Sequence, residues 1–280
     1  MRTRVLAAIL SLLTMVGLAT VPAFATTGGA PDGDAHPNVG LILYYTAEGR
    51  FRCTATLVSP TVLLTAAHCT DGHKGKALVD FRSFISNGPT SGYPVAIDTT
   101  AGYTQAQIEA AGFKSGVAHT HPEYSDFTDE DNWNDVGVVV LDTPVTDLPL
   151  SPIAGLDTLD DYAQPTLSQT LFTAVGYGTE IRKAASGPQK PTPMSYPMLR
   201  RYVDMPGQKL TPQILQTNGN IHDTRGTGGT CFGDSGGPVF LNGEIVAVTS
   251  YGLTSNCRYI GGYQRVDIDV VQDWLAEFGL

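Results

Sequence analysis

The segment that most constrains the fold of this chain is the hexapeptide Gly233-Asp234-Ser235-Gly236-Gly237-Pro238. It holds a serine in a tight turn, because glycines on both sides accept backbone conformations and close contacts that other residues do not. Gly233 lets its own N–H group and that of Ser235 point toward one place, which suits a developing negative charge. Such a serine becomes a strong nucleophile only when a base reaches it, so the fold must bring a distant residue to the turn.

The base, and a carboxylate to orient it, come from two upstream segments. His68 follows two alanines and precedes a cysteine, and Asp135 opens a long apolar run. We assign Ser235 as the nucleophile, His68 as general base and then general acid, and Asp135 as the carboxylate that holds the imidazole tautomer. The N–H groups of Gly233 and Ser235 form the predicted oxyanion hole.

Each of these residues also has a simpler explanation. An Asp-Ser-Gly-Gly segment is common in turns, His68 fits a buried core histidine, and Asp135 fits a cap at the start of a strand. The order His, Asp, Ser along the chain, with a cysteine next to His68 and another near Ser235, makes a chance combination rare.

At these motifs the chain resembles the secreted, trypsin-like serine proteases of the chymotrypsin family, from about Gly28 to its C-terminal segment. The resemblance implies an all-β fold of two six-stranded antiparallel barrels of the chymotrypsin type with a C-terminal helix. It places the join between the barrels near residues 148–171 and the active site between them. It implies neither a cofactor nor a metal.

Short apolar runs between turn residues predict strands along most of the chain. The strands we expect span residues 39–45, 51–58, 62–65, 136–141, 171–175, 239–241 and 245–250. Apolar residues at helical spacing predict a helix over residues 268–278, and residues 100–111 fit either a short helix or a loop.

The first 25 residues have the pattern of a secretory signal peptide. Arg2 and Arg4 precede an apolar run, and Ala23-Phe24-Ala25 fits a cleavage site. A transmembrane anchor needs about 20 apolar residues, and this run is shorter and interrupted. We therefore expect a secreted protein with a signal peptide at 1–25 and one peptidase domain at 26–280.

Charge excludes some partners. The formal net charge of the whole chain is −10 at pH 7, and an acidic surface repels nucleic-acid phosphates. No stretch after the leader is apolar enough to cross a bilayer. We expect a monomer with protein or peptide substrates and proteinaceous inhibitors as partners, and neither nucleic acid nor membrane.

Four cysteines in a secreted chain allow three pairings. The family resemblance selects Cys53 with Cys69 and Cys231 with Cys257. Both bridges would then lie beside predicted site residues.

The resemblance also locates a substrate pocket. Its predicted residues are Gly229 at the base, Thr230, Phe232, the strand Ser250-Tyr251-Gly252, and Gly261 at the far wall. Trypsin-type enzymes carry an aspartate at the base, so an uncharged Gly229 favours an apolar or broad preference for P1, the residue before the cleaved bond. The hydroxyl of Thr230 can form a hydrogen bond, so a polar P1 residue is also compatible with this pocket.

Asp234 matches the family's partner for the new N-terminal ammonium group. The corresponding N-terminal stretch is Thr26-Thr27-Gly28-Gly29, which no Arg or Lys precedes. We expect signal removal to free the α-amino group of Thr26 for this pairing. The alternative is that another positive group satisfies Asp234.

Metal sites are the weaker interpretation of the histidines and acidic turns. His68, Asp71 and His73, and likewise His119 and His121, have a superficial ligand spacing. The acidic turns 32–34 and 157–161 lack the spacing of an EF-hand loop.

Taken together, the motifs predict a serine endopeptidase, with two alternatives: a non-catalytic homologue that binds ligands, or an esterase with the same three residues.

Overall fold

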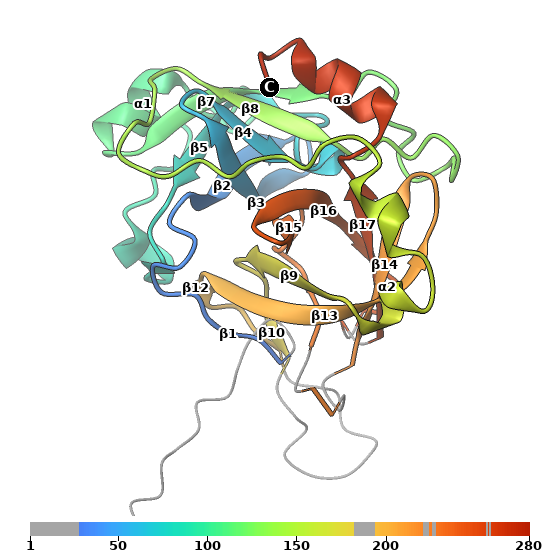
Figure 1. The fold of residues 1–280 in the computed structure, drawn as a ribbon. Coiled ribbons are helices and arrows are strands. Elements are labelled where there is room, and N and C mark those ends of the chain that lie inside the picture. The colour runs from blue at the N-terminus through green and yellow to red at the C-terminus, as the bar shows by residue number, and fades with distance from the viewer. Residues whose placement is uncertain (1–27, 182–193, 221–223, 226–227, 256, 258) are drawn as a thin grey trace, which may run out of the picture.

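The computed structural model describes residues 28–181, 194–220, 224–225, 228–255, 257 and 259–280. The predicted signal peptide, Thr26 and Thr27 lie outside the described residues. Figure 1 shows two barrels of strands side by side, with a helix at the C-terminal end packed across the upper one.

The first barrel is closed and antiparallel, with the strand order β2-β3-β4-β8-β7-β5. Its strands are β2 (Val39–Thr46), β3 (Gly49–Ser59), β4 (Val62–Thr65), β5 (Lys74–Asp80), β7 (Lys114–Thr120) and β8 (Gly137–Leu141). Strand β8 is almost wholly apolar because nearly all of its residues are buried.

The second barrel has the order β13-β14-β17-β16-β15-β9, closed by pairing of β9 with β13. Its strands are β9 (Leu171–Gly176), β13 (Arg201–Leu210), β14 (Ile214–Gly219), β15 (Pro238–Leu241), β16 (Glu244–Gly252) and β17 (Tyr259–Arg265). Strand β1 (Ala30–Pro31) pairs with Arg201 and Tyr202 at the start of β13. The two barrels confirm the predicted all-β fold of the chymotrypsin type.

The remaining elements are short. The two-stranded ladders pair β6 (Phe84–Ile85) with β12 (Met198–Leu199), and β10 (Glu180–Ile181) with β11 (Met194–Ser195). The helices are η1 (Ala67–Cys69), η2 (Gly88–Ser91), α1 (Gln105–Ala110), η3 (Thr158–Tyr162), α2 (Thr166–Gln169) and α3 (Asp269–Ala276). Helix α3 confirms the predicted C-terminal helix, and α1 shows that the segment 100–111 contains a short helix. Across the described residues, every helix is too short or too polar to cross a membrane.

Apolar residues of both barrels and of α3 form one shared core. Its buried members include Val39 and Val138 from the first barrel, Val248 from the second, and Trp274 from α3. Each barrel also has its own internal cluster. The shared core fixes the barrels against one another, so the line where they meet is rigid enough to position a site.

The segment 142–170 connects the two barrels and contains most of the stretch 148–171 that we expect as their join. Near the start of β13, the fully buried Arg200 ties the N-terminal residues to both barrels. Its guanidinium pairs with the Asp32 carboxylate at 2.8 Å and donates to the carbonyl oxygens of Gly33, Val39 and Phe81. Asp32 and Gly33, which directly follow β1, are therefore anchored to Arg200.

Candidate active site

His68 and Asp135 meet at the junction of the barrels. His68 lies in η1, directly after β4, and Asp135 lies two residues before β8, which pairs with β4. The Asp135 carboxylate is 2.8 Å from His68 Nδ1 and accepts the backbone N–H of His68 at 2.9 Å. Because an ionised carboxylate only accepts, Nδ1 carries the proton and Nε2 is left as an acceptor.

A buried network holds the Asp135 carboxylate in place. Ser250 donates its hydroxyl to Asp135 at 2.6 Å, and the Trp133 indole N–H donates to Ser250 at 2.9 Å. The backbone N–H of Asp135 donates to Gln264 at 3.0 Å, and the amide of Gln264 is held by Gln213. Sequence reasoning missed Trp133, Gln213 and Gln264 as supports, because no local pattern marks a contact between distant strands.

Ser235 lies in a tight turn, as its flanking glycines predict. Gly233 and Gly236 have positive φ angles of 101° and 74°, and the N–H of Gly237 closes the turn on Asp234 at 2.8 Å. The Ser235 carbonyl accepts the N–H of Thr54 on β3 at 2.8 Å, so this loop of the second barrel rests on the first.

The same turn lies against the segment that leads to His68. A Cβ atom at Gly236 would overlap the Thr65 hydroxyl and lie 2.8 Å from the backbone nitrogen of Ala66. The segments that carry Ser235 and His68 therefore meet at this junction. Within the described part of the chain no hydrogen bond joins them, and in unliganded enzymes this bond is often long.

The Asp234 side chain is buried against Gly176 and Gly178, at the end of β9. Its carboxylate accepts the backbone N–H groups of Gly178 at 2.7 Å and Cys231 at 2.8 Å. Burial raises the pKa of Asp234 to about 6, against the opposing effects of these two bonds and of the positive charges of Arg52 and Arg201.

The predicted substrate pocket is a cavity of about 180 Å³ beside Ser235. It is lined by Thr230, Cys231, Phe232, Ser235, Thr249, Ser250, Tyr251, Gly252, Thr254, Ser255 and Cys257. Gly229 and Gly261 line a small adjoining recess, which shares Thr230 and Gly252 with the cavity. The Tyr263 hydroxyl, which sequence reasoning missed, lies in this recess 2.9 Å from the Thr230 hydroxyl. The described residues of both linings are uncharged.

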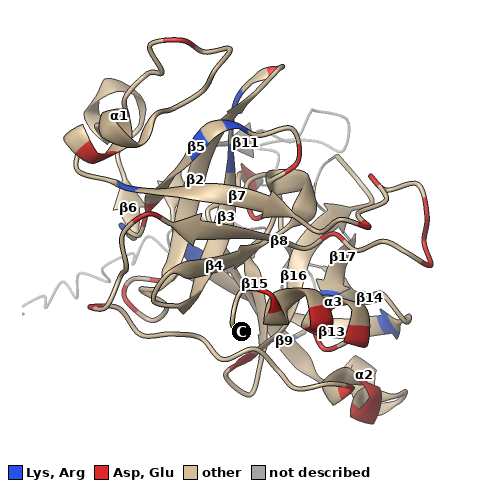
Figure 2. Cartoon of the chain, turned by 90° about the horizontal axis from the view of Figure 1, so that it is seen from above, with Lys and Arg blue, Asp and Glu red and all other residues tan. Residues whose placement is uncertain are grey.

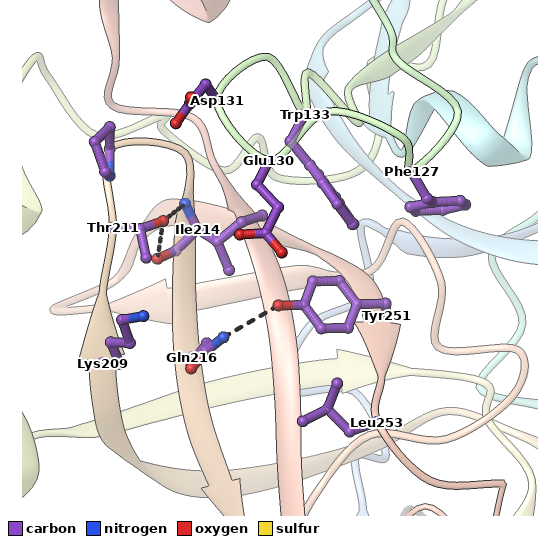
Figure 3. A pocket seen from close by; sticks show the side chains of 11 residues that line it. Phe127, Glu130, Asp131, Trp133, Lys209, Thr211, Ile214, Gln216, Tyr251 and Leu253 are labelled. Carbon is purple, nitrogen blue, oxygen red and sulfur yellow. Dashed lines mark hydrogen bonds between the residues drawn. The ribbon is translucent and has the colours of Figure 1, made fainter.

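A second cavity of about 530 Å³ continues the cleft beyond Tyr251 (Figure 3). Aromatic rings join the two regions, because Trp133 lies 5.3 Å from Tyr251 and 5.2 Å from Phe127 between ring centroids. Phe127 in turn lies 5.6 Å from the His68 ring. Figure 3 shows the Glu130 side chain directed into this cavity, near Tyr251.

The cysteines form the pairs that the resemblance implies, Cys53–Cys69 and Cys231–Cys257. Among the described residues, one trio of possible metal ligands converges, namely Cys53, His68 and Cys69. Both of its cysteines are in the disulfide, so neither offers a thiolate. His73 does not join His68; it stacks on Tyr44 at 4.4 Å, and burial lowers its pKa to about 4.

Comparisons with known proteins agree with this geometry. The sequence model of the Trypsin family matches residues 37–275. Brachyurin of Leptuca pugilator is 29% identical over 235 residues, which cover 81% of this chain and 88% of that protein. Trypsin of Saccharopolyspora erythraea is 29% identical over 231 residues, which cover 80% of this chain and 86% of that protein.

Solved structures share the fold. HL collagenase superimposes with a TM-score of 0.60 at 16% sequence identity. The superposition covers 92% of this chain and 99% of that one. Human heparin binding protein gives a TM-score of 0.56 at 19% sequence identity, and the superposition covers 90% of this chain and 95% of that one. At such identities the likeness supports the fold alone, whereas the family match covers most of the sequence. This chain therefore belongs to the trypsin family of serine proteases.

Proposed function

We propose that this protein is a secreted serine endopeptidase with His68, Asp135 and Ser235 as its catalytic residues. The observation that carries the proposal is the two-point attachment of His68 to the buried Asp135 carboxylate, beside the turn that presents Ser235. This attachment fixes both the position and the tautomer that a general base for the serine requires.

In the proposed reaction, Ser235 Oγ attacks the carbonyl carbon of the peptide bond and its proton passes to His68 Nε2. The resulting oxyanion accepts the N–H groups of Gly233 and Ser235, and one such donor lowers the barrier by about 2.7–4 kcal/mol. The protonated His68 then donates to the departing amine. A water molecule, deprotonated by His68, hydrolyses the acyl-enzyme and restores Ser235.

The edge of β16 supplies a place for the substrate backbone. Strand β15 pairs with β16 only as far as Val248, while β17 continues on the other side opposite Tyr251 and Gly252. Among the described strands, none pairs with the remaining edge of residues 250–252. A peptide that adds there in antiparallel fashion directs the residues before the scissile bond toward Leu253 and the cavity of Figure 3.

The uncharged lining of the pocket beside Ser235 supports an apolar or broad P1 preference. A library of peptides that differ only at P1 is expected to show cleavage after uncharged residues. Peptides with Arg or Lys at P1 should be cleaved poorly, because the charged side chain would lose hydration in the pocket without gaining a carboxylate partner. Dominant cleavage after Arg or Lys would contradict this assignment of the pocket.

A fluorophosphonate probe tests the nucleophile. The wild-type protein is expected to react covalently, and Ser235→Ala should abolish labelling. The same substitution should lower kcat by on the order of 10⁶, because the other two catalytic residues contribute little without the nucleophile. A folded wild type that stays unlabelled would favour the non-catalytic binding homologue. Labelling with cleavage of esters but not of peptides would favour the esterase.

We further propose that the chain is exported, that removal of residues 1–25 leaves Thr26 as the mature N-terminus, and that its ammonium group pairs with Asp234. Strand β1, four residues beyond Thr26, pairs with Arg201 and Tyr202, and Arg201 is one of the charges that act on Asp234. The mature protein is proposed to be a monomer that binds protein or peptide substrates, and proteinaceous inhibitors, in the same cleft.

Stability measured against pH tests the pairing of Thr26 with Asp234. When the α-amino group is acetylated, folded Asp234 binds its proton more tightly than unfolded Asp234, because its pKa rises from 3.8 to about 6. The free energy of unfolding should then fall by roughly 3 kcal/mol as pH rises through this window. With a free ammonium group the fall should be much smaller. Identical curves for the two forms, or an intact mass that starts well beyond Thr26, would contradict the proposal.

A further inference from the structure

A third cavity, of about 630 Å³, is lined by β2 and β3 of the first barrel, by the segment 88–95 and by Met198, and it carries positive charge. Arg50 and Arg52 line it together with Phe51, Tyr93 and Met198. The two arginines are two residues apart on β3, so strand alternation places them on one face. Asp and Glu are absent from the described lining, although acidic residues outnumber basic ones by 27 to 17 in the whole chain.

Arg52 connects this cavity to the nucleophile turn. A Cβ atom built on Gly233 would lie 3.3 Å from Arg52 Nε. The side chain of Arg52 is thus a direct neighbour of the glycine that supplies one of the proposed oxyanion donors. The cavity shares no lining residue with the two cavities beside Tyr251. It therefore meets the site from a different direction.

The guanidinium of Arg52 is available to a ligand. Among the described residues it has no hydrogen-bond or ion-pair partner, and Asp234 acts on it only through its charge. The Asp234 carboxylate is already bonded to the backbone of Gly178 and Cys231. Burial lowers the pKa of Arg52, but an arginine keeps its charge at any pH at which a protease works.

Arg50 stands at the more exposed end of the same cavity. Its guanidinium donates weakly to the Pro94 carbonyl at 3.3 Å and reaches the Tyr103 hydroxyl at 3.5 Å. These partners are neutral, so neither arginine has its charge cancelled by a carboxylate in the lining. In Figure 2 acidic residues stand on α1 and α3, whereas the described lining of this cavity carries basic residues and no carboxylate.

We propose that this cavity binds an acidic side chain among the first three substrate residues after the scissile bond. The inference rests on the proposed function, because antiparallel addition to β16 takes the preceding residues toward Leu253 and leaves the following ones on the side of Gly233 and Arg52. An extended peptide rises about 3.3 Å per residue, so the three residues after the scissile bond extend over roughly 10 Å. A carboxylate there meets two guanidinium groups that present planar pairs of donors.

Matched fluorogenic peptides test the proposal. They share one sequence, with Glu, Gln or Lys placed in turn at each of the three positions after the scissile bond. At one position at least, wild-type kcat/KM should be about tenfold higher for Glu than for Lys at low ionic strength, with Gln between them. The ratio should shrink with added salt, because the cavity is open to screening ions.

Variants assign the effect to the two arginines. Arg50→Gln and Arg52→Gln should each reduce the Glu-to-Lys ratio, and the double variant should bring it close to one. The ratio cancels any common effect of Arg52 on the oxyanion hole, since both peptides use the same turn. Lys209→Gln removes one positive charge from the cavity of Figure 3, and it should leave the ratio unchanged.

The outcomes separate this inference from the proposed function. Equal cleavage of all Glu and Lys peptides by an active wild type overturns the acidic preference and leaves the peptidase in place. If the folded wild type cleaves none of the peptides, the proposed peptidase activity is contradicted. Fluorescence anisotropy of the same peptides with Ser235→Ala then tests whether the cavity binds an acidic side chain. If the Glu peptides bind more tightly than the Lys peptides, and Arg52→Gln removes this difference, the proposed role of the cavity is supported. Equal binding of the two sets overturns it.

Discussion

Thr54, a fully buried residue of β3, makes hydrogen bonds with every polar atom it has. Its N–H donates to the Ser235 carbonyl and its hydroxyl donates to the Gly233 carbonyl, both at 2.8 Å. The same hydroxyl accepts the N–H of Tyr177 at 3.2 Å, and its carbonyl accepts the Thr65 hydroxyl at 2.8 Å. One residue of the first barrel therefore holds the turn of the second barrel that carries the proposed nucleophile.

The neighbouring residue performs the matching task for the proposed base. Cys53 is joined to Cys69, which directly follows His68, and a bridge of this loop size contributes about 3 kcal/mol in the chain-entropy model. Two consecutive residues of β3 thus anchor the segments of His68 and Ser235. The pairing of β4 with β8 then places Asp135 opposite the same region. The geometry of the site depends on this strand more than on the loops around it.

Much of this organisation is encoded locally and could be predicted from the sequence. The motifs around His68, Asp135 and Ser235, together with alternating apolar runs, identified the family and the two-barrel fold. The roles of the individual site residues stay predictions that the chemistry has to test. Strand β13 was not predicted, because Pro206 and Gly207 interrupt a run that nevertheless pairs with β9 up to Pro206 and with β14 from Gly207 on. The supports Gln213 and Gln264, and the approach of Arg52 to Gly233, depend on contacts between distant residues that no local pattern records.

The most direct test of the account compares Thr54→Val with Thr56→Val. Both threonines are buried on β3, but the Thr56 hydroxyl has no hydrogen-bond partner among the described residues. We predict that Thr54→Val slows fluorophosphonate labelling of Ser235 by at least about tenfold, since it leaves the Gly233 carbonyl and the Tyr177 N–H without their partner. Thr56→Val should label at the wild-type rate. Equal rates for the two folded variants would contradict the claim that Thr54 sets the position of the nucleophile.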